Sequence, residues 1–227
     1  MKETVIELLQ STHRENIETL IEFLEKSDFF TAPASVVHHL AYPGGLVEHS
    51  LNVYNCAKKL NKKYEHLFSD DSITITSLLH DVCKVNYYEE VNENPTDPQR
   101  RYLASLMNKA GLEVPVKLNK TYASILIDFM IKQYKGDKVI PAYVRNYQVK
   151  DQLPLGHGEK SLYIISQYIE LTPEEALAIR WHMGAWDLNL SSPYQKYAYQ
   201  EAVKFTKLTT LLELADLEAT HLIEEEE

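Results

Sequence analysis

The sequence predicts an all-α protein, a helical bundle that carries one small extended insert. Apolar residues recur at the three- and four-residue spacing of amphipathic helices along most of the chain. Glycine is scarce, with 7 in 227 residues, whereas helix-favouring Leu, Glu and Lys are abundant. A chain of this length can bury a sizeable core. We therefore expect a single domain over residues 1–227, with its core at about residues 33–222.

Composition and charge limit the expected surroundings and partners. No apolar run approaches the roughly 20 residues that a membrane-spanning helix needs, so we expect no membrane partner. Two cysteines, Cys56 and Cys83, cannot form a disulfide framework, which favours a reduced, cytoplasmic protein. A net charge of −10 argues against general coating of nucleic acid. Residues 117–150 reverse this charge locally, with seven Lys or Arg against two Asp.

The N-terminal segment, residues 1–30, is expected to form a helix. Its apolar stripe consists of Ile17, Leu20, Ile21 and Leu24, at the i, i+3, i+4, i+7 spacing. Thr12 and Glu15 match a capping box at its start. The loop SDFFTAPAS then ends the helix.

A second helix follows the glycine pair at 44–45, and a third runs from Ile73 to Asp81. The apolar stripe of the second helix contains Leu46, Val53, Cys56 and Leu60, and His49 lies on the same stripe. Asp71 or Ser72 can cap the third helix, which ends in the sequence SLLHDVCK. Both helices therefore place ionisable groups on or beside apolar faces.

Two central segments lack helical spacing. Residues 92–98, NENPTDP, are typical of a polar loop. Residues 139–156 alternate Tyr and Val and have Pro near their edges, which predicts a short β-hairpin or extended arm. With the lysines and arginine around it, this segment forms a small basic, tyrosine-rich insert.

The C-terminal third begins with a strong helix start. Thr172 is a preferred N-cap, Pro173 suits the first helical position and Glu175 completes a capping box. We expect this helix to run to about Met183 and to stop at Gly184. Residues 185–195 should form a loop and residues 197–222 a long final helix. The acidic tail, residues 223–227, is expected to be frayed and solvated.

Six ionisable side chains fall on apolar faces or at helix ends: His49, His80, Asp81, His157, His182 and Asp216. A lone buried carboxylate is costly unless it is paired or binds a metal. Taken singly, each residue is explained as well by a hydrogen-bonded core side chain, a cap or an ion pair. Taken together, imidazoles and carboxylates from separate helices suit a divalent ion such as Mn, Fe, Ni, Zn or Co. Mg²⁺ is a further candidate.

The order of these residues and their flanking sequences resemble a known superfamily. His49, then His80-Asp81, then Asp216 resembles the H…HD…D pattern of the HD-domain metal-dependent phosphohydrolases. The flanking sequences GGLVEHSLNVY, LLHDVCKV, LGHGEKS, IRWHMG and ELADLEAT are similar too. The stretch PASVVHHLAYPGGLVEH most resembles the HD domain of bacterial 3′–5′ exoribonucleases. The separate OB domain of those enzymes does not fit within this chain.

The resemblance implies a ligand set. His49, His80, Asp81 and Asp216 would hold one ion, and in two-metal subtypes Asp81 bridges to a second ion that His157 and His182 reach. Two departures put the second ion in question. Met183 stands where such subtypes often have a second histidine, and Cys83 stands where glycine is common in the HDxGK pattern. One ion is therefore expected, and a second is left open.

The resemblance also implies hydrolysis of a phosphoester, expected to be that of a nucleotide, by metal-activated water. Besides Asp81, the candidate catalytic residues are Lys84, for a phosphate oxygen, and His38 and His39, for substrate or leaving group. The candidate substrate-binding residues are Lys84, Arg145, Tyr143 and Tyr147. Surface ion pairs, helix capping and ordinary packing are the competing explanations for these residues.

Three other functions stay open at this point. The first is an exoribonuclease-like phosphodiesterase that acts on short single-stranded nucleic acid, which the basic insert favours. The second is a non-catalytic nucleotide-binding sensor, which Met183 and Cys83 favour. The third is an interaction domain with buried histidines. The expected partner is a small phosphorylated substrate, and the sequence carries no signal for an oligomeric state.

Overall fold

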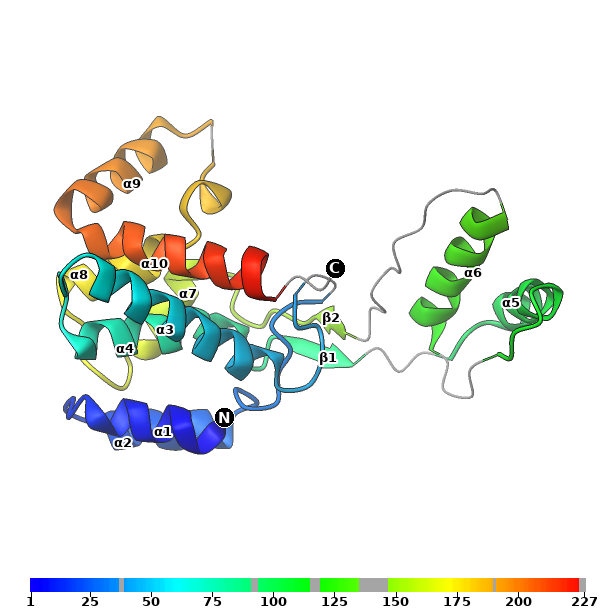
Figure 1. The fold of residues 1–227 in the computed structure, drawn as a ribbon, viewed down its shortest axis with the longest axis horizontal. Coiled ribbons are helices and arrows are strands. Elements are labelled where there is room, and N and C mark those ends of the chain that lie inside the picture. The colour runs from blue at the N-terminus through cyan, green and yellow to red at the C-terminus, as the bar shows by residue number, and fades with distance from the viewer. Residues whose placement is uncertain (37–38, 91–93, 115–118, 135–146, 190, 225–227) are drawn as a thin grey trace.

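The computed structural model describes residues 1–36, 39–90, 94–114, 119–134, 147–189 and 191–224. It confirms the predicted all-α fold with a small two-stranded insert (Figure 1). Within these ranges no helix has the length and apolar character needed to cross a membrane.

In chain order the elements are α1 (Lys2–Ser11), α2 (Ile17–Lys26), α3 (Gly45–Lys63), α4 (Asp70–Leu79), the 3₁₀ helix η1 (Val82–Lys84), β1 (Tyr88–Glu90), α5 (Asp97–Lys109), α6 (Lys120–Tyr134), β2 (Tyr147–Val149), α7 (His157–Ile165), α8 (Pro173–Trp181), the 3₁₀ helix η2 (Gly184–Asp187), α9 (Pro193–Phe205), α10 (Lys207–Glu218) and the π-helical turn η3 (Ala219–Ile223).

The main core lies between α3, α4, α8 and α10, with α1 and α2 packed along one side (Figure 1). Leu46, Leu78, Ile179 and Leu212 each come from a different one of these four helices and are fully buried. Burial of a side chain of this size stabilises the fold by about 1.5–3 kcal/mol. The apolar spacing read from the sequence therefore selects the faces that form this core.

Of two predicted helix starts, one is confirmed and the other lies earlier in the chain. Thr172 and Glu175 form the predicted capping box at the start of α8, which is confirmed. The third helix begins one turn earlier than expected, because Ser69 is its N-cap and accepts a hydrogen bond from the N–H of Ser72. Asp71 and Ser72 lie inside the helix.

The N-terminal segment is a pair of helices, not the single helix expected. The capping box of Thr12 and Glu15 is wrong, because the Thr12 hydroxyl donates to the carbonyl of Leu9, 2.7 Å away, and so belongs to the end of α1. Asn16, with a φ of 61°, precedes α2. Asparagine tolerates this left-handed conformation better than most residues. It separates two helices that the apolar spacing alone would join.

The final helix is also divided. The backbone of Thr206 is extended (φ −141°, ψ 134°), and its hydroxyl accepts from the N–H of Leu208 as the N-cap of α10. The predicted continuous helix over residues 197–222 is therefore wrong. The predicted loop at 185–195 also contains η2, and α9 begins within it at Pro193. The break lets α10 enter the core at an angle that α9 does not follow (Figure 1).

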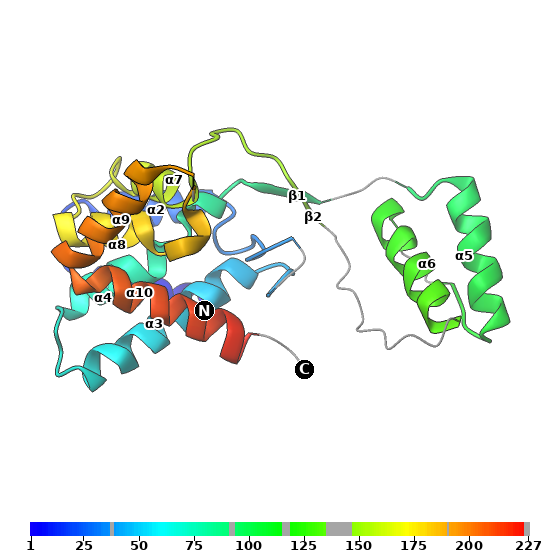
Figure 2. The same ribbon diagram turned by 90° about the horizontal axis from the view of Figure 1, so that it is seen from above.

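The two strands pair over a long sequence distance. β1 and β2 are antiparallel, with Tyr88 opposite Val149 and Glu90 opposite Tyr147. Between them lie α5 and α6, which Figures 1 and 2 show as a pair set apart from the other helices. The pair has its own apolar cluster, formed by Leu103, Leu106, Met107, Ala123 and Met130. These two helices were not predicted. Of the insert expected at 139–156, residues 139–146 lie outside the described residues, and Tyr147–Val149 form β2.

A buried ion pair ties the first loop to the bundle. The fully buried carboxylate of Glu175 accepts from both terminal nitrogens of Arg14, at 2.7 and 2.9 Å, and from the hydroxyl of Ser72 at 2.8 Å. Burial alone would raise the pKa of Glu175. The hydrogen bonds from these donors lower it by more than burial raises it, so the net shift is downward. The pair joins the α1–α2 loop to α4 and α8.

Replacement of Arg14 by Ala should destabilise the protein strongly, because it leaves Glu175 buried without its charged partner. The expected loss is about 3–5 kcal/mol in the free energy of unfolding, measured by urea titration. Lys26→Ala is the matched control, because Lys26 forms an exposed pair with Glu22 and should cost less than about 1 kcal/mol. Equal losses in the two variants would contradict a structural role for the Arg14–Glu175 pair.

Candidate metal centre

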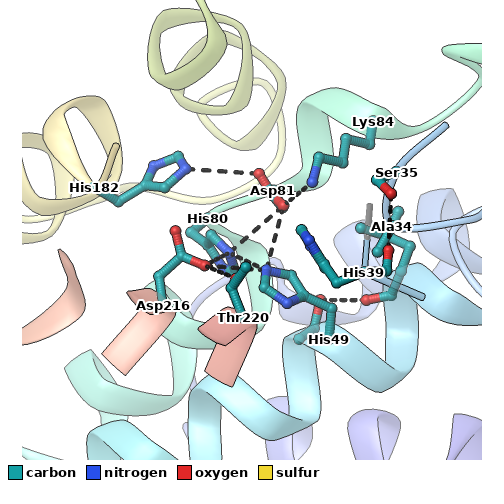
Figure 3. A network of polar contacts seen from close by, with 12 residues as sticks. Ala34, Ser35, His39, His49, His80, Asp81, Lys84, His182, Asp216 and Thr220 are labelled. Atoms are coloured by element: carbon teal, nitrogen blue, oxygen red, sulfur yellow. Dashed lines mark hydrogen bonds and ion pairs between the residues drawn. The ribbon is translucent and has the colours of Figure 1, made fainter. Parts of the chain in front are cut away.

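Four side chains from three parts of the bundle meet at its centre (Figure 3). His49 projects from α3, His80 and Asp81 follow the last turn of α4, and Asp216 projects from α10. Nε2 of His49 lies 3.2 Å from Nε2 of His80, 3.3 Å from Oδ1 of Asp216 and 3.5 Å from Oδ2 of Asp81. Nε2 of His80 lies 3.7 Å from Asp81 Oδ2 and 4.0 Å from Asp216 Oδ1. These separations are close to those of donor atoms that share one ion, about 3–4 Å.

Asp81 presents its other oxygen to a second pair of rings. Oδ1 contacts Nε2 of His157, the first residue of α7. The same oxygen lies 3.6 Å from Nε2 of His182, which follows α8 (Figure 3). Oδ2 faces His49 and His80. One carboxylate therefore stands between two donor groups, which is the arrangement that a ligand bridging two ions requires.

Two of the histidines are held by the helix ends that carry them. His80 is the C-cap of α4 and His182 is the C-cap of α8. In each case Nδ1 donates to the carbonyl three residues earlier, that of Ser77 at 2.8 Å and that of Ile179 at 2.7 Å. The last carbonyls of a helix lack partners within the helix, so they are available for this bond. The bond fixes the proton on Nδ1 and turns Nε2 toward the cluster.

His49 is oriented by a residue that the sequence did not reveal. Its Nδ1 lies 3.0 and 3.1 Å from the two carboxylate oxygens of Glu224, which also accepts from Nδ2 of Asn52 at 2.9 Å. A carboxylate only accepts, so Nδ1 of His49 must carry a proton. The predicted solvation of the acidic tail is therefore wrong at Glu224, which is only 7% exposed. Residues 225–227 lie outside the described residues.

The charges of the cluster stabilise one another. Burial raises the pKa of Asp81, but Lys84 and the neighbouring histidines lower it well below its usual range. Burial alone would likewise raise the pKa of Asp216. The hydrogen bond and the charge of His49 outweigh burial, so the net shift of this pKa is downward. Nζ of Lys84 lies 2.6 Å from Oδ2 of Asp81, and this contact keeps the pKa of Lys84 raised despite burial. Burial lowers the pKa of His80 to about 3, so His80 is neutral near pH 7.

The donor set fits a divalent transition metal. Buried imidazole nitrogens and carboxylate oxygens suit such ions, and Nε2 of His182 is buried without a hydrogen bond to any described residue. The groups of the described residues that could each hold an ion are His49, His80 and Asp216; His80, Asp81 and His182; Asp81, Cys83 and His157; and His39, His49 and Glu224. The structure thus brings together all six residues that the sequence proposed as metal ligands.

The other candidate residues fall into two groups. Lys84 and His39 lie at the cluster, where the His39 ring centroid is 4.9 Å from that of His49. Burial, then repulsion by His49 and Lys84, lowers the pKa of His39 to about 4. Tyr147 lies in β2 and is 8% exposed, which fits packing better than base stacking. The remaining candidates, His38, Tyr143 and Arg145, lie outside the described residues.

Substitution of Glu224 by Gln should weaken metal binding, because His49 loses the negative partner that orients and polarises its ring. Residues that support a ligand in this way typically contribute 10- to 100-fold in metal affinity, and a loss in that range is expected by calorimetric titration with Mn²⁺ or Zn²⁺. Glu201→Gln is the control, because the Glu201 side chain is 45% exposed, lies on α9 and pairs with Lys204. Unchanged affinity in Glu224→Gln would contradict this role.

Metal binding should release protons near pH 7. Burial lowers the pKa of His49, but hydrogen bonds to Asp216 and Glu224 raise it to about 9. Burial likewise lowers the pKa of His157, but Cys83 and Asp81 raise it to about 10. A raised pKa means that each ring is protonated below that value and must lose a proton to become a ligand.

Calorimetry in buffers of different ionisation enthalpy should therefore detect proton release at pH 7, with about one to two protons per protein coming from these two rings. The affinity should rise as the pH approaches 9. A binding enthalpy independent of the buffer at pH 7 would contradict the assignment of His49 and His157 as ligands.

No family model matches the chain, and no solved structure matches it. The chain is 34% identical over 136 residues to the dihydroneopterin 2′,3′-cyclic phosphate phosphodiesterase of Methanocaldococcus jannaschii, a match that covers 55% of this chain and 52% of that relative. The chain thus spans about half the length of a curated relative that is named as a cyclic phosphate phosphodiesterase.

Proposed function

We propose that the protein is a metal-dependent phosphohydrolase that cleaves a phosphoester, with a nucleotide as the expected substrate. The observation that carries this proposal is the convergence of His49, His80, Asp81 and Asp216. The two Nε2 atoms lie 3.2 Å from each other and 3.3–4.0 Å from the carboxylate oxygens of Asp81 and Asp216. The similarity to a phosphodiesterase and the resemblance to the HD-domain superfamily support the same reaction class.

The residues would divide the work between two positions. His49, His80, Asp81 and Asp216 would hold one ion, and Asp81 with His157 and His182 would face the second position. When bound, a divalent ion of this kind supplies Lewis acidity, which activates water and neutralises phosphate charge. Asp81 would fix the two positions relative to each other, because each of its carboxylate oxygens faces one of the two donor groups.

Lys84 is the candidate for binding a phosphate oxygen. Its ammonium group is buried against Asp81 and stays charged, and a desolvated positive charge attracts a phosphate more strongly than a solvated one. His39 is neutral near pH 7, so its ring would accept or donate one hydrogen bond to the substrate and would lack the second proton that a general acid needs. His38, Tyr143 and Arg145 stay candidates for substrate binding from the sequence alone.

The substrate class is inferred from the relative. A protein named for a 2′,3′-cyclic phosphate suggests a small cyclic phosphodiester as the first candidate, and a nucleoside 2′,3′-cyclic phosphate combines that group with a nucleotide. An exoribonuclease-like activity is the second candidate, favoured by the PASVVHHLAYPGGLVEH stretch and the local basic charge of residues 117–150. The net charge of −10 disfavours it.

A substrate panel should separate these functions. Nucleoside 2′,3′-cyclic phosphates, nucleoside monophosphates and a labelled RNA oligomer are each incubated with Mn²⁺, Fe²⁺, Ni²⁺, Zn²⁺, Co²⁺ or Mg²⁺. We expect ring opening of the cyclic phosphate that is abolished by chelation. Asp81→Ala should lower kcat about a thousandfold or more, with helix content unchanged by circular dichroism. Asp70→Ala, an exposed carboxylate at the other end of α4, should retain activity.

Other outcomes would replace the proposal. Stepwise release of mononucleotides from RNA would favour the exoribonuclease, and tight nucleotide binding without product under any metal would favour the sensor. Protein that binds no divalent ion, together with full stability and helix content in Asp81→Ala, would leave only an interaction domain.

A further inference from the structure

Cys83 lies in the turn that joins the two donor groups. It is two residues after Asp81, in η1, and its free thiol is buried. The backbone N–H of Cys83 donates to the hydroxyl of Ser161, 3.1 Å away on α7, and α7 begins with His157. The turn that carries the thiol is therefore fixed to the helix that carries a candidate ligand.

The thiol of Cys83 faces two other donors. Its sulfur, a carboxylate oxygen of Asp81 and a ring nitrogen of His157 all lie within 4.8 Å of one another. Donors that share one tetrahedral ion lie about 3–4 Å apart, so small side-chain rotations suffice to bring these three to one ion. Packing in the core alone does not require a carboxylate and an imidazole beside the thiol.

A fourth donor points to the same place. Nε2 of His182 is buried, makes no hydrogen bond with any described residue and lies 3.6 Å from Asp81 Oδ1. That oxygen is also the one that His157 contacts. Because Nδ1 of His182 donates to Ile179, Nε2 offers a lone pair when the ring is neutral. A buried acceptor without a donor is costly, and a cation at this position would satisfy it.

We propose that Cys83 supplies a thiolate ligand to a second metal ion, together with Asp81, His157 and His182. The inference rests on the proposed function, because Asp81 is shared with the first site. On binding, the thiol proton passes to solvent as the sulfur–metal bond forms. One position would then have nitrogen and oxygen donors only, and its neighbour would include sulfur.

The sulfur donor makes the two positions chemically unequal. Thiolate selects softer ions such as Zn²⁺ over Mg²⁺ or Mn²⁺, which prefer oxygen. The position of Cys83 should therefore reject Mg²⁺ and retain Zn²⁺ or Co²⁺, even where the neighbouring position exchanges its ion. If Cys83 only packs in the core, it confers no such preference.

Cobalt binding tests the ligand directly, without an activity assay. Metal-free protein is titrated with Co²⁺ under anaerobic conditions, and a thiolate-to-cobalt charge-transfer band is sought in the near ultraviolet. We expect the band in the natural protein and in Cys56→Ser, because Cys56, on α3, belongs to none of the candidate ion-holding groups of the described residues. Cys83→Ser should lose the band, and its affinity for the ion at this position should fall at least tenfold.

The single-thiol variant guards against misfolding of the test variant. The chain has two cysteines, so Cys83 is the one thiol that remains in Cys56→Ser. A sulfur band in this variant must therefore come from Cys83, and it is observed without altering Cys83 itself. Cobalt bound with visible absorption but without the sulfur band would overturn the inference and leave the proposed function intact. Failure of the protein to bind cobalt at all would overturn both.

Discussion

The buried carboxylate of Asp81 is the constraint on which the centre of the bundle depends. A carboxylate removed from water requires compensating charge and hydrogen bonds, and here five elements supply them. α3 brings His49, the end of α4 brings His80, η1 brings Lys84, and α7 and α8 bring His157 and His182. The packing of these helices therefore also sets the geometry of the centre, because the same elements supply both.

The sequence predicted the fold class and the main core well, because apolar spacing reports which helix faces are buried. It failed where a single residue interrupts the spacing. Asn16 and Thr206 separate helices through backbone conformations that the neighbouring apolar residues do not reveal. α5 and α6 escaped prediction for another reason: they bury a small cluster against each other and not against the main core.

The candidate ligands were predictable because each lies on an apolar helix face or at a helix end, and because their order along the chain resembles a known pattern. Glu224 was not, since it is the first of four consecutive glutamates and nothing in that run distinguishes one carboxylate from the next. Its contact with His49 spans 175 residues. The relation of Cys83 to His157 likewise depends on how η1 meets α7, which spacing along the chain does not encode.

The pairing of β1 with β2 connects the α5–α6 pair to the rest of the bundle at one place. Glu90 and Tyr147 are partners across the ladder, so the polypeptide leaves the bundle and returns to it at neighbouring points. Adjacent antiparallel strands can be closed by as few as two residues. The segment between residues 90 and 147 thus joins two adjacent points of the bundle. A change in the length of this segment would therefore leave the ends of β1 and β2 adjacent, and it would not by itself move the helices that carry the candidate ligands.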